Sequence, residues 1–373
     1  MKKVIFVATV VKLHIMEFHI PYLRLFQGMG WKTAVAARND YENPEDCRIP
    51  CCDTYYDIPF SRSPFSPENI RAYRMLKDIL EDGGYDIIHC HTPVGGILAR
   101  IAAKSARRQG TKVIYTAHGF HFYRGAPLMN WLVYFPAEWL CSFWTDILIT
   151  INKEDYGFAG KHMHAGKVEY VPGVGVDLEK FGACCVDRQK KRDEIGCRTN
   201  DTMLLSVGEL NQNKNHETII RMLAKMGRKD LHYAIAGSGQ LHEYLENLIK
   251  GLGIAKNVHL LGYRHDVNGW YAAADIFVFP SFREGLSVSL MEAMASGLPC
   301  VVGRIRGNTD LIREGKGGWY AGSEQEYMEK INFLAASPEK RKQMGAYNQK
   351  AVREYGDKAV MEKMRAIYLS AGC

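Results

Sequence analysis

The segment PSFREGLSVSLMEAMASGLP, residues 280–299, is the strongest indication of the fold class of this chain. It continues the apolar run Asp275–Pro280, which predicts a buried strand. The residues from about Leu286–Ser296 predict a helix, which the glycine and proline that follow would stop. The next apolar run, Pro299–Gly303, predicts another strand. A strand, a helix and a strand in this order are typical of a parallel sheet covered by helices.

Apolar, β-branched runs alternate with helical stretches along the whole chain. In the first half the predicted strands are Lys3–Val10, Lys32–Ala37, Tyr85–Cys90, Lys112–Ala117 and Ile147–Ile151. In the second half they are Met203–Val207, His232–Ala236, Val258–Leu261, Asp275–Pro280 and Pro299–Gly303. The fold class that we predict is therefore α/β, with two doubly wound, Rossmann-like parallel-sheet domains in tandem.

The alternation restarts after the segment Val171–Asp177, which is poor in regular signals and typical of an interdomain linker. We predict a first domain over residues 1–175 and a second over 176–355. A C-terminal helix over 356–373 could pack back on the first domain. Such sheets bind ligands at the carboxyl ends of their strands, so we expect a ligand in a cleft between two facing domains.

Composition and charge exclude several classes of protein. Of the 373 residues 47% are hydrophobic and 24% charged, which excludes a disordered or fibrous chain. A net charge of +7 is too small to require nucleic acid as a partner. No run of 18 apolar residues predicts a transmembrane helix, and residues 1–10 fit a first strand better than a signal peptide.

The ten cysteines do not form a pattern that suggests disulfides or a metal. Their clusters are Cys47 with Cys51 and Cys52, and Cys184 with Cys185. Adjacent cysteines suit neither a disulfide framework nor a tetrahedral zinc site. We expect free thiols in a reducing cytoplasm.

Glu284 and Glu292 are the sharpest chemical signal in residues 280–299. A rise of about 1.5 Å per helical residue would separate them by roughly 12 Å. That span fits a nucleotide sugar, with a carboxylate on the hydroxyls at each end. The N–H groups near Leu286–Ser289 would face the diphosphate between them. The plainer alternative is one exposed helical glutamate and one loop glutamate.

With this stretch, the chain resembles the retaining glycosyltransferases of family 4, which have the two-domain GT-B fold. The spacing of Glu284 and Glu292, followed by Ala-Met-Ala-x-Gly-x-Pro, matches the hallmark of that family. Further segments resemble the family in order: VDLEKF at 176–181, SVGELNQNKN at 206–215, AGSG at 236–239 and LGYRHD at 261–266. The resemblance extends over essentially the whole chain.

The resemblance implies a donor site in the second domain. Lys214 would bind the diphosphate and Glu292 the ribose of a nucleotide sugar. Glu284, with the N–H groups of Gly285 and Leu286, would hold the transferred sugar. The remaining donor-site candidates are Ser287, Tyr263 and Arg264 near the base, and Gly237 and Gly239 for close backbone approach. An ordinary strand-to-helix turn explains those two glycines equally well.

One position departs from the family pattern. Glu209 stands five residues before Lys214, where the family commonly has an arginine. An anion thus replaces a cation beside the expected phosphates. Arg304 or Arg306, which follow the predicted strand Pro299–Gly303, could compensate.

The acceptor is expected in the first domain. The segment YTAHGFH at 115–121 resembles the family's Thr-x-His-Gly motif and gives His118 an active-site role. His121, His89 and His91 are weaker candidates, because a lone histidine is more often a hydrogen-bonded core residue. The loop at 9–21 has His14 and His19 in place of the family's Gly-Gly pair, and we expect it to shape the acceptor site.

Residues 120–144 are unusually aromatic, and nearby basic residues fall at helical spacing: Arg100, Lys104, Arg107 and Arg108. Aromatic residues beside a basic face suit peripheral contact with anionic lipid at the inner membrane leaflet. The alternatives are a large core helix and a solvated charged face.

Together these features imply a retaining, hexosyltransferase-type enzyme of the cytoplasm or the cytoplasmic membrane face. It would move a hexose or N-acetylhexosamine from a UDP-sugar to a polyprenyl-diphosphate-linked sugar in exopolysaccharide or capsule assembly. The resemblance implies no metal and no other cofactor, and the chain has no Asp-x-Asp pair. Three alternatives stay open: a sugar-nucleotide 2-epimerase, a non-catalytic nucleotide-sugar-binding scaffold, and a nucleic-acid binder.

Overall fold

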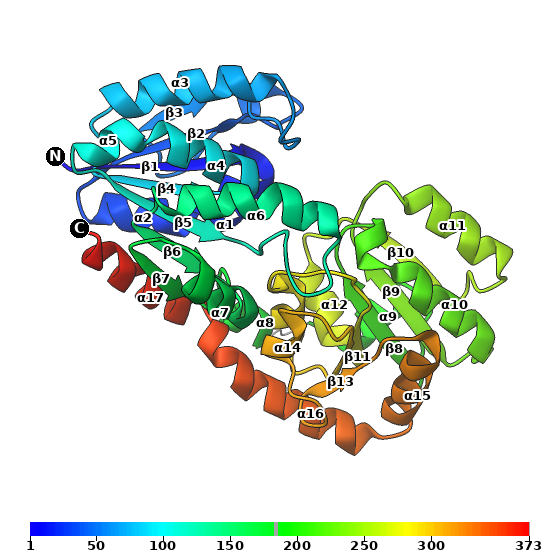
Figure 1. Cartoon of the computed structure of the whole chain (residues 1–373). Helices are drawn as coiled ribbons and strands as arrows, with labels where there is room; N and C mark the ends of the chain where they lie inside the picture. Colours follow the sequence, from blue (N-terminus) through cyan, green and yellow to red (C-terminus); the bar gives the residue numbers. More distant parts are fainter. Residues whose placement is uncertain (183–185, 373) are drawn as a thin grey trace. The chain divides into compact units, whose positions relative to one another are not determined.

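The computed structural model describes residues 1–182 and 186–372 (Figure 1). Cys184 and Cys185 therefore lie outside the described residues. The chain forms two units, Met1–Val171 with Met361–Cys373, and Pro172–Val360. Each unit is a parallel sheet with helices packed on its faces, which confirms the predicted fold class of two doubly wound domains.

The first unit has a seven-stranded sheet in the order β3-β2-β1-β4-β5-β6-β7, with all neighbours parallel. Its strands are β1 (Lys3–Val10), β2 (Lys32–Arg38), β3 (Thr54–Asp57), β4 (Ile87–His91), β5 (Lys112–Ala117), β6 (Ile147–Thr150) and β7 (Lys167–Tyr170). Its helices are η1 (Val11–Ile15), α1 (Met16–Phe18), α2 (Ile20–Gly28), η2 (Pro44–Asp46), α3 (Glu68–Asp82), α4 (Pro93–Ala102), α5 (Lys104–Arg108), α6 (Leu128–Ser142) and α7 (Lys153–His162). The C-terminal helix α17 (Asp357–Ser370) adds its last turns to this unit.

The second unit has a six-stranded sheet in the order β10-β9-β8-β11-β12-β13, again parallel throughout. Its strands are β8 (Thr202–Val207), β9 (Leu231–Ala236), β10 (Val258–Gly262), β11 (Ile276–Phe279), β12 (Cys300–Val302) and β13 (Gly318–Tyr320). Its helices are α8 (Leu178–Gly182), α9 (Arg188–Asp193), η3 (Gln212–Lys214), α10 (His216–Met226), α11 (His242–Gly251), α12 (Val267–Ala273), α13 (Val288–Ala295), α14 (Asn308–Leu311), α15 (Glu324–Ala335), α16 (Pro338–Ala351) and η4 (Val352–Tyr355).

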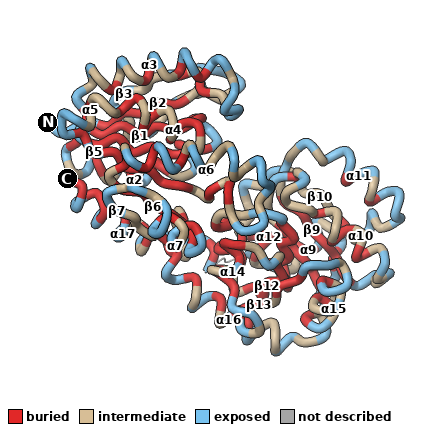
Figure 2. The backbone as a smooth tube through the Cα atoms, viewed as in Figure 1, coloured by how far each residue is buried: buried red, intermediate tan, exposed pale blue. Residues whose placement is uncertain are grey.

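The core of each unit lies between its sheet and the covering helices. Figure 2 shows the buried residues concentrated along the central strands and the exposed ones on the outer helices. The strands β1 and β11 are almost fully apolar and buried, because both faces of a doubly wound sheet are covered. This is why their sequences contain continuous apolar runs instead of an alternating pattern.

Three strands were not predicted: β3, β7 and β13. Each lies at the edge of its sheet. The residues of β3 and β7 are at best half-buried, and β13 has only three residues. An edge strand is covered less than a central one, so its sequence lacks the continuous apolar run that identified the others.

The helix of residues 280–299 begins later than predicted. Helix α13 starts at Val288, and Ser287 is its N-cap, with a hydroxyl that accepts a hydrogen bond from the Leu290 N–H at 3.3 Å. Glu284 therefore lies in the loop before the helix. The separation of roughly 12 Å from Glu292 assumed helical rise over all eight residues and is not valid here.

The predicted basic face was also wrong. Arg100 is almost completely buried and pairs with Glu138 of α6 at 2.7 Å, and Arg107 pairs with Asp146 at 3.0 Å. A guanidinium that enters the core can satisfy a buried carboxylate, so helical spacing alone did not reveal which face carries the charge. In the described part of the chain, no helix combines the length and apolar character needed to cross a bilayer.

Candidate active site

Each sheet changes direction at one pair of neighbouring strands, β1 with β4 and β8 with β11. The carboxyl ends of such strands are where doubly wound sheets bind ligands. In the second unit, the loops after β8 and β11 contain Lys214 and Glu284. In the first unit, the loop after β1 contains His14 and His19, and β4 ends at His91.

Lys214 and Glu284 form an ion pair at the switch point of the second unit. The Lys214 Nζ lies 2.7 Å from Glu284 Oε1, and both side chains are largely buried. The Lys214 ammonium also lies 4.7 Å from the centre of the Phe279 ring at the end of β11. The sequence assigned these two residues to the diphosphate and to the sugar separately, whereas the structure brings them into direct contact.

Hydrogen bonds join the two loops that carry this pair. Asn213 donates through Nδ2 to the Arg283 carbonyl at 2.9 Å, and its own carbonyl accepts from the Phe282 N–H at 2.9 Å. Asn215 donates through Nδ2 to the Pro280 carbonyl at 3.2 Å. Asn215 has a left-handed backbone (φ 53°, ψ 36°), which asparagine tolerates better than most residues. These contacts fix Lys214 opposite Glu284.

Gly237 and Gly239 allow the loops after β8 and β9 to touch. A Cβ on Gly237 would lie 1.9 Å from the Gly208 carbonyl oxygen, and one on Gly239 would lie 2.5 Å from the Leu210 carbonyl oxygen. Both glycines have positive φ, at 155° and 159°. This contact between the loops is enough to require glycine at both positions. It fits the alternative in which the two glycines serve an ordinary strand-to-helix turn. Close approach of a nucleotide there stays a prediction.

Glu292 lies on α13 and accepts a hydrogen bond from the Tyr271 hydroxyl at 2.9 Å. Burial raises the pKa of Glu292 to about 7, against the opposing effect of that hydrogen bond. The carboxyl group can therefore change its charge near neutral pH. The predicted ribose contact is untested.

Tyr263 and Arg264 follow β10 and differ in their surroundings. The Tyr263 side chain is 68% exposed. The Arg264 guanidinium donates to both carboxylate oxygens of Asp266 at 2.8 and 2.9 Å, which keeps the pKa of that carboxyl far below its usual range. The predicted contact of this segment with the base stays a prediction.

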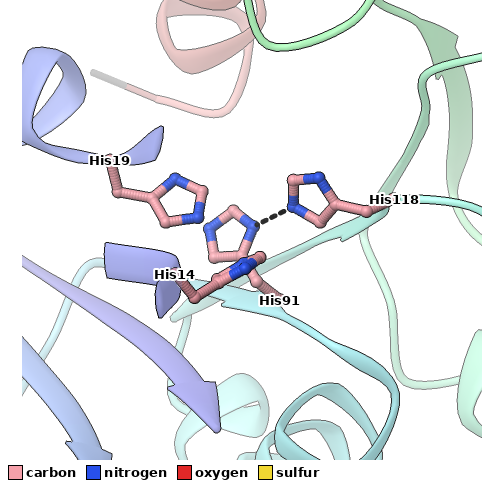
Figure 3. A group of neighbouring side chains, drawn as sticks. All are labelled: His14, His19, His91 and His118. Atoms are coloured by element: carbon pink, nitrogen blue, oxygen red, sulfur yellow. Dashed lines mark hydrogen bonds between the residues drawn. The ribbon is translucent and has the colours of Figure 1, made fainter. Parts of the chain in front are cut away.

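Four imidazoles gather at the switch point of the first unit (Figure 3). We call His14, His19, His91 and His118 the four-histidine cluster. Each offers a ring nitrogen within 4.8 Å of the others. His91 Nδ1 and His118 Nε2 are 3.4 Å apart, and the rings of His19 and His91 stack at 3.8 Å. The cluster thus brings together the predicted acceptor-side residues His14 and His19, the predicted active-site residue His118, and the weaker candidate His91.

Burial keeps these imidazoles neutral at pH 7. It lowers the pKa of His118 to about 4 and that of His14, His19 and His91 well below the usual value. Neighbouring histidines lower the pKa of the last three further. The switch point of the first unit therefore holds polar, uncharged nitrogens.

His89 lies beside the cluster but has its own partners. Its Nδ1 lies 2.8 Å from the Tyr368 hydroxyl of α17, and its Nε2 lies 2.8 Å from the Thr116 hydroxyl. Burial lowers the pKa of His89 to about 3. A satisfied core histidine describes His89 better than a site residue does. Sequence reasoning missed Tyr368, which lies 279 residues away along the chain.

A cavity of about 270 Å³ opens next to the four-histidine cluster. Its lining includes His14, Arg62, Thr92, His121 and Tyr134. The His121 ring lies 4.5 Å from the Tyr134 ring and is not part of the cluster. The cavity thus combines a cation, imidazoles and aromatic surface in the unit where the acceptor was expected.

Two family models match consecutive parts of the chain. Residues 3–152 match the model described as Glycosyl transferase 4-like, and residues 187–351 match Glycosyl transferases group 1. A Bacillus subtilis (strain 168) protein named glycosyltransferase EpsD is 39% identical over 373 residues, which cover 98% of this chain and 96% of the relative. The chain belongs to the group 1 glycosyltransferases.

Further proteins similar to this group 1 glycosyltransferase are one sequence relative and two solved structures. An Escherichia coli UDP-Gal:alpha-D-GlcNAc-diphosphoundecaprenol alpha-1,3-galactosyltransferase is 32% identical over 269 residues, 68% of each chain. Anabaena HepE, crystallised with UDP-glucose, superposes with a TM-score of 0.80 at 19% identity, over 99% of this chain and 100% of HepE. The lipopolysaccharide glycosyltransferase WaaG gives a TM-score of 0.75 at 18% identity, over 98% and 99%. The GT-B fold is confirmed.

In this glycosyltransferase, Glu209 has an exposed side chain that accepts a hydrogen bond from Asn211 Nδ2 at 2.9 Å. Arg304 forms an ion pair with Glu314, and this pair keeps the Arg304 charge at the surface. Arg306 is only 8% exposed. It precedes Gly307, where a Cβ would lie 2.4 Å from the Gly285 carbonyl oxygen, so the segment of Arg306 packs against the loop before α13. Compensation for Glu209 by either arginine stays a prediction.

Sequence reasoning missed two kinds of site residue in this glycosyltransferase. Asn213 and Asn215 flank Lys214, and the asparagine-rich segment NQNKN was the available signal for a tight loop. Tyr271 gave no signal, because its contact with Glu292 depends on how α12 packs against α13. His91 had been a weak candidate and gains its importance from the adjacency of β1 and β4.

Proposed function

We propose that the chain is a retaining glycosyltransferase that moves a hexose or N-acetylhexosamine from a UDP-sugar to a polyprenyl-diphosphate-linked saccharide in surface polysaccharide assembly. The observation that carries the proposal is the Lys214–Glu284 pair, 2.7 Å apart at the carboxyl ends of β8 and β11 and four residues before α13. A fixed cation, a carboxylate and a helix N-terminus are what a diphosphate-linked sugar requires of a site.

In the proposed reaction the charge develops on the departing diphosphate. Lys214 and the first N–H groups of α13 stabilise that charge, so the diphosphate needs no metal ion. Glu284 turns from Lys214 to the hydroxyls of the transferred sugar. The bond from the anomeric carbon to the diphosphate breaks, the acceptor oxygen bonds to that carbon on the same face, and the acceptor proton passes to the leaving diphosphate.

The acceptor is proposed to occupy the cavity of about 270 Å³ in the first unit. Arg62 supplies a cation for an acceptor diphosphate, and His121 and Tyr134 supply aromatic surface for a sugar ring. The galactosyltransferase relative is named for a diphosphoundecaprenol acceptor, and the other close relative is named EpsD. The first name supports a lipid-linked acceptor, and the second supports a role in exopolysaccharide assembly. His118 would act where donor sugar and acceptor meet.

Peripheral contact with the cytoplasmic face of a membrane fits the same acceptor. Large apolar side chains are exposed along α6 and at its end: Leu128, Met129, Leu132, Trp139, Leu140 and Phe143. Leu128, Leu132, Trp139 and Phe143 recur at intervals of four or seven residues and so share one side of the helix, which Met129 and Leu140 widen. The Lys104 ammonium lies 3.3 Å from the centre of the neighbouring Trp144 ring. Apolar residues beside a cation are typical of surfaces that dock on anionic lipid.

The decisive experiment measures UDP binding and sugar transfer in two matched variants. Glu284→Gln removes the sugar-binding charge and releases Lys214, so UDP affinity should hold while transfer falls about 100-fold or more. Glu324→Gln, in the surface pair with Lys225, is the control and should leave both unchanged. Transfer at the normal rate by Glu284→Gln contradicts the proposal.

A binding scaffold is the second candidate, because Glu209 replaces the usual arginine. The wild-type chain would then bind UDP-sugars in a thermal-shift panel yet neither transfer nor hydrolyse them with any lipid-linked acceptor. A UDP-sugar at about 100 times its dissociation constant should stabilise the folded protein by roughly 2.7 kcal/mol. Turnover of the donor excludes the scaffold.

Membrane contact is tested with vesicles that contain or lack anionic lipid. Wild-type protein should sediment with anionic vesicles at low salt, and Leu132→Gln should weaken this binding. Ile70→Gln, at an exposed apolar position on α3, is the matched control. Equal binding by both variants contradicts a role for α6.

A further inference from the structure

The four-histidine cluster has the composition of a metal site. Its members come from three segments: His14 and His19 from the loop after β1, His91 from the end of β4, and His118 from just after β5 (Figure 3). Each contributes a ring nitrogen within 4.8 Å of the others. Imidazole nitrogen is the commonest protein ligand for zinc and the related d-block cations.

Unpaired buried nitrogens point to an occupant. Among the described residues, His19 has no hydrogen-bond partner at either ring nitrogen, and His14 and His91 have none at Nε2. His19 and His91 are each only 1% exposed. Buried polar groups normally have partners, so several orphaned nitrogens in one place require an explanation. A cation that takes one nitrogen from each ring would partner His14 Nε2 and one nitrogen of His19.

We propose that the four-histidine cluster binds one divalent transition-metal ion of the zinc class. Zinc bound tetrahedrally at about 2.0–2.1 Å from each nitrogen would set its ligands about 3.4 Å apart. The distance from His91 Nδ1 to His118 Nε2 is 3.4 Å and already fits one edge of that tetrahedron. Small rotations of the remaining rings bring in the other nitrogens. A metal bound to His91 Nδ1 and His118 Nε2 would replace the hydrogen bond between these two atoms.

Hard cations are a poor match, because Mg²⁺ and Ca²⁺ require oxygen ligands. The second group that could hold a metal is Cys197, Asp201 and His232 in the other unit. There His232 Nε2 already lies 3.3 Å from Asp201, and burial raises the pKa of the Cys197 thiol to about 11, which opposes the thiolate that a metal needs. The four-histidine cluster is therefore the stronger site.

A bound ion would tie the loop after β1, including η1 and α1, to the ends of β4 and β5. It would also occupy the lone pair of His118, so the metal-bound form and the form in which His118 meets a substrate are separate states. The test of metal binding therefore measures the bound metal itself and does not use activity.

The test is equilibrium dialysis of the full chain, stripped with a chelator, against micromolar ZnCl₂ with excess MgCl₂, followed by elemental analysis. We expect one equivalent of zinc in the wild type, and loss of that equivalent in His19→Gln and in His91→Gln. His121→Gln removes a histidine of the same unit outside the cluster and should keep the zinc. His232→Gln, in the competing group, should also keep it.

Cobalt substitution in the wild-type chain needs no variant and guards against misfolding of the histidine mutants. Tetrahedral Co²⁺ with nitrogen ligands should give strong visible absorption without a thiolate charge-transfer band in the near ultraviolet. A thiolate band together with zinc loss in His232→Gln would assign the ion to the Cys197 group and overturn the proposal. Zinc content in folded His19→Gln equal to that of the wild type, or no zinc retained by the wild type, would also overturn it.

Discussion

The two switch points of this chain share a topology and differ in charge. At β1 and β4 four imidazoles meet, and burial keeps them neutral. At β8 and β11 a lysine and a glutamate form an ion pair, next to the start of α13. Parallel strand order determines where a ligand binds in both units, but the side chains decide which ligand. Charged groups suit a nucleotide diphosphate, and neutral nitrogens suit an acceptor or a metal.

The units also differ in where they bury an ion pair. Arg100 and Glu138 in the first unit are almost completely buried, far from solvent, with the Tyr115 hydroxyl on the second carboxylate oxygen at 2.9 Å. Lys214 and Glu284 are partly exposed at 18% and 13%. A pair that a ligand must reach has to keep contact with solvent, whereas the fully buried pair serves stability.

The largest effect is expected at the buried pair. Arg100→Met leaves the Glu138 carboxylate in the core without its cation and should destabilise the first unit by about 3–5 kcal/mol. The double variant Arg100→Met/Glu138→Gln should regain much of that loss. Hydrogen exchange of the β4 and β5 amides measures both. A single variant as stable as the wild type would contradict a structural role for the pair.

The pH dependence of the second unit follows from Glu292. The pKa of Glu292 in the folded state is raised to about 7, so the folded site favours the protonated carboxyl. The free energy of unfolding therefore falls as the pH rises toward and through that value. Between pH 5 and pH 8 the loss should be about 3 kcal/mol at most. Glu292→Gln should make the free energy of unfolding less dependent on pH. Urea unfolding at several pH values, with hydrogen exchange of the β8 and β11 amides as the readout, measures that dependence. An unchanged slope would mean that another group titrates.

The partly exposed pair should affect binding more than folding. Lys214→Met removes the cation proposed for the diphosphate and should weaken UDP binding about 10- to 100-fold in calorimetry. Lys225→Met, which breaks the surface pair with Glu324, is the matched control and should bind UDP normally. Equal UDP affinity in both variants would separate Lys214 from the donor site.

The smallest effect concerns the backbone beside Lys214. Asn215→Ala and Asn215→Gly both remove the amide that bonds the Pro280 carbonyl, so their difference isolates the left-handed backbone. The alanine variant should be less stable by about 1 kcal/mol, because its Cβ disfavours that conformation. Urea unfolding of the second unit measures the difference. Equal stabilities would show that the loop relaxes to an ordinary conformation.

Local signals in the sequence predicted much of this molecule. The apolar runs predicted the central strands, because both sheet faces are covered, and the chain's motifs identified the family before any contact was known. The strand-to-helix turn at Gly237 and Gly239 was predicted, since tight loops depend on a few adjacent residues. Ser287 was a donor-site candidate, and only the structure shows it as the N-cap of α13. Edge strands such as β3 were not predicted, because their exposed residues carry little of the apolar pattern.

Contacts between distant residues could not be predicted from local sequence signals. The Lys214–Glu284 pair, the burial of Arg100 and the four-histidine cluster each join segments that strand order or helix packing brings together. From helical spacing alone, Arg100 could share one basic face with Lys104, Arg107 and Arg108. The loop residues His14 and His19 gave no indication that His91 would lie beside them. The chemical groups that the chain carries, and most of its local elements, follow from the order of its residues. Their meeting depends on long-range packing, which local propensity does not encode.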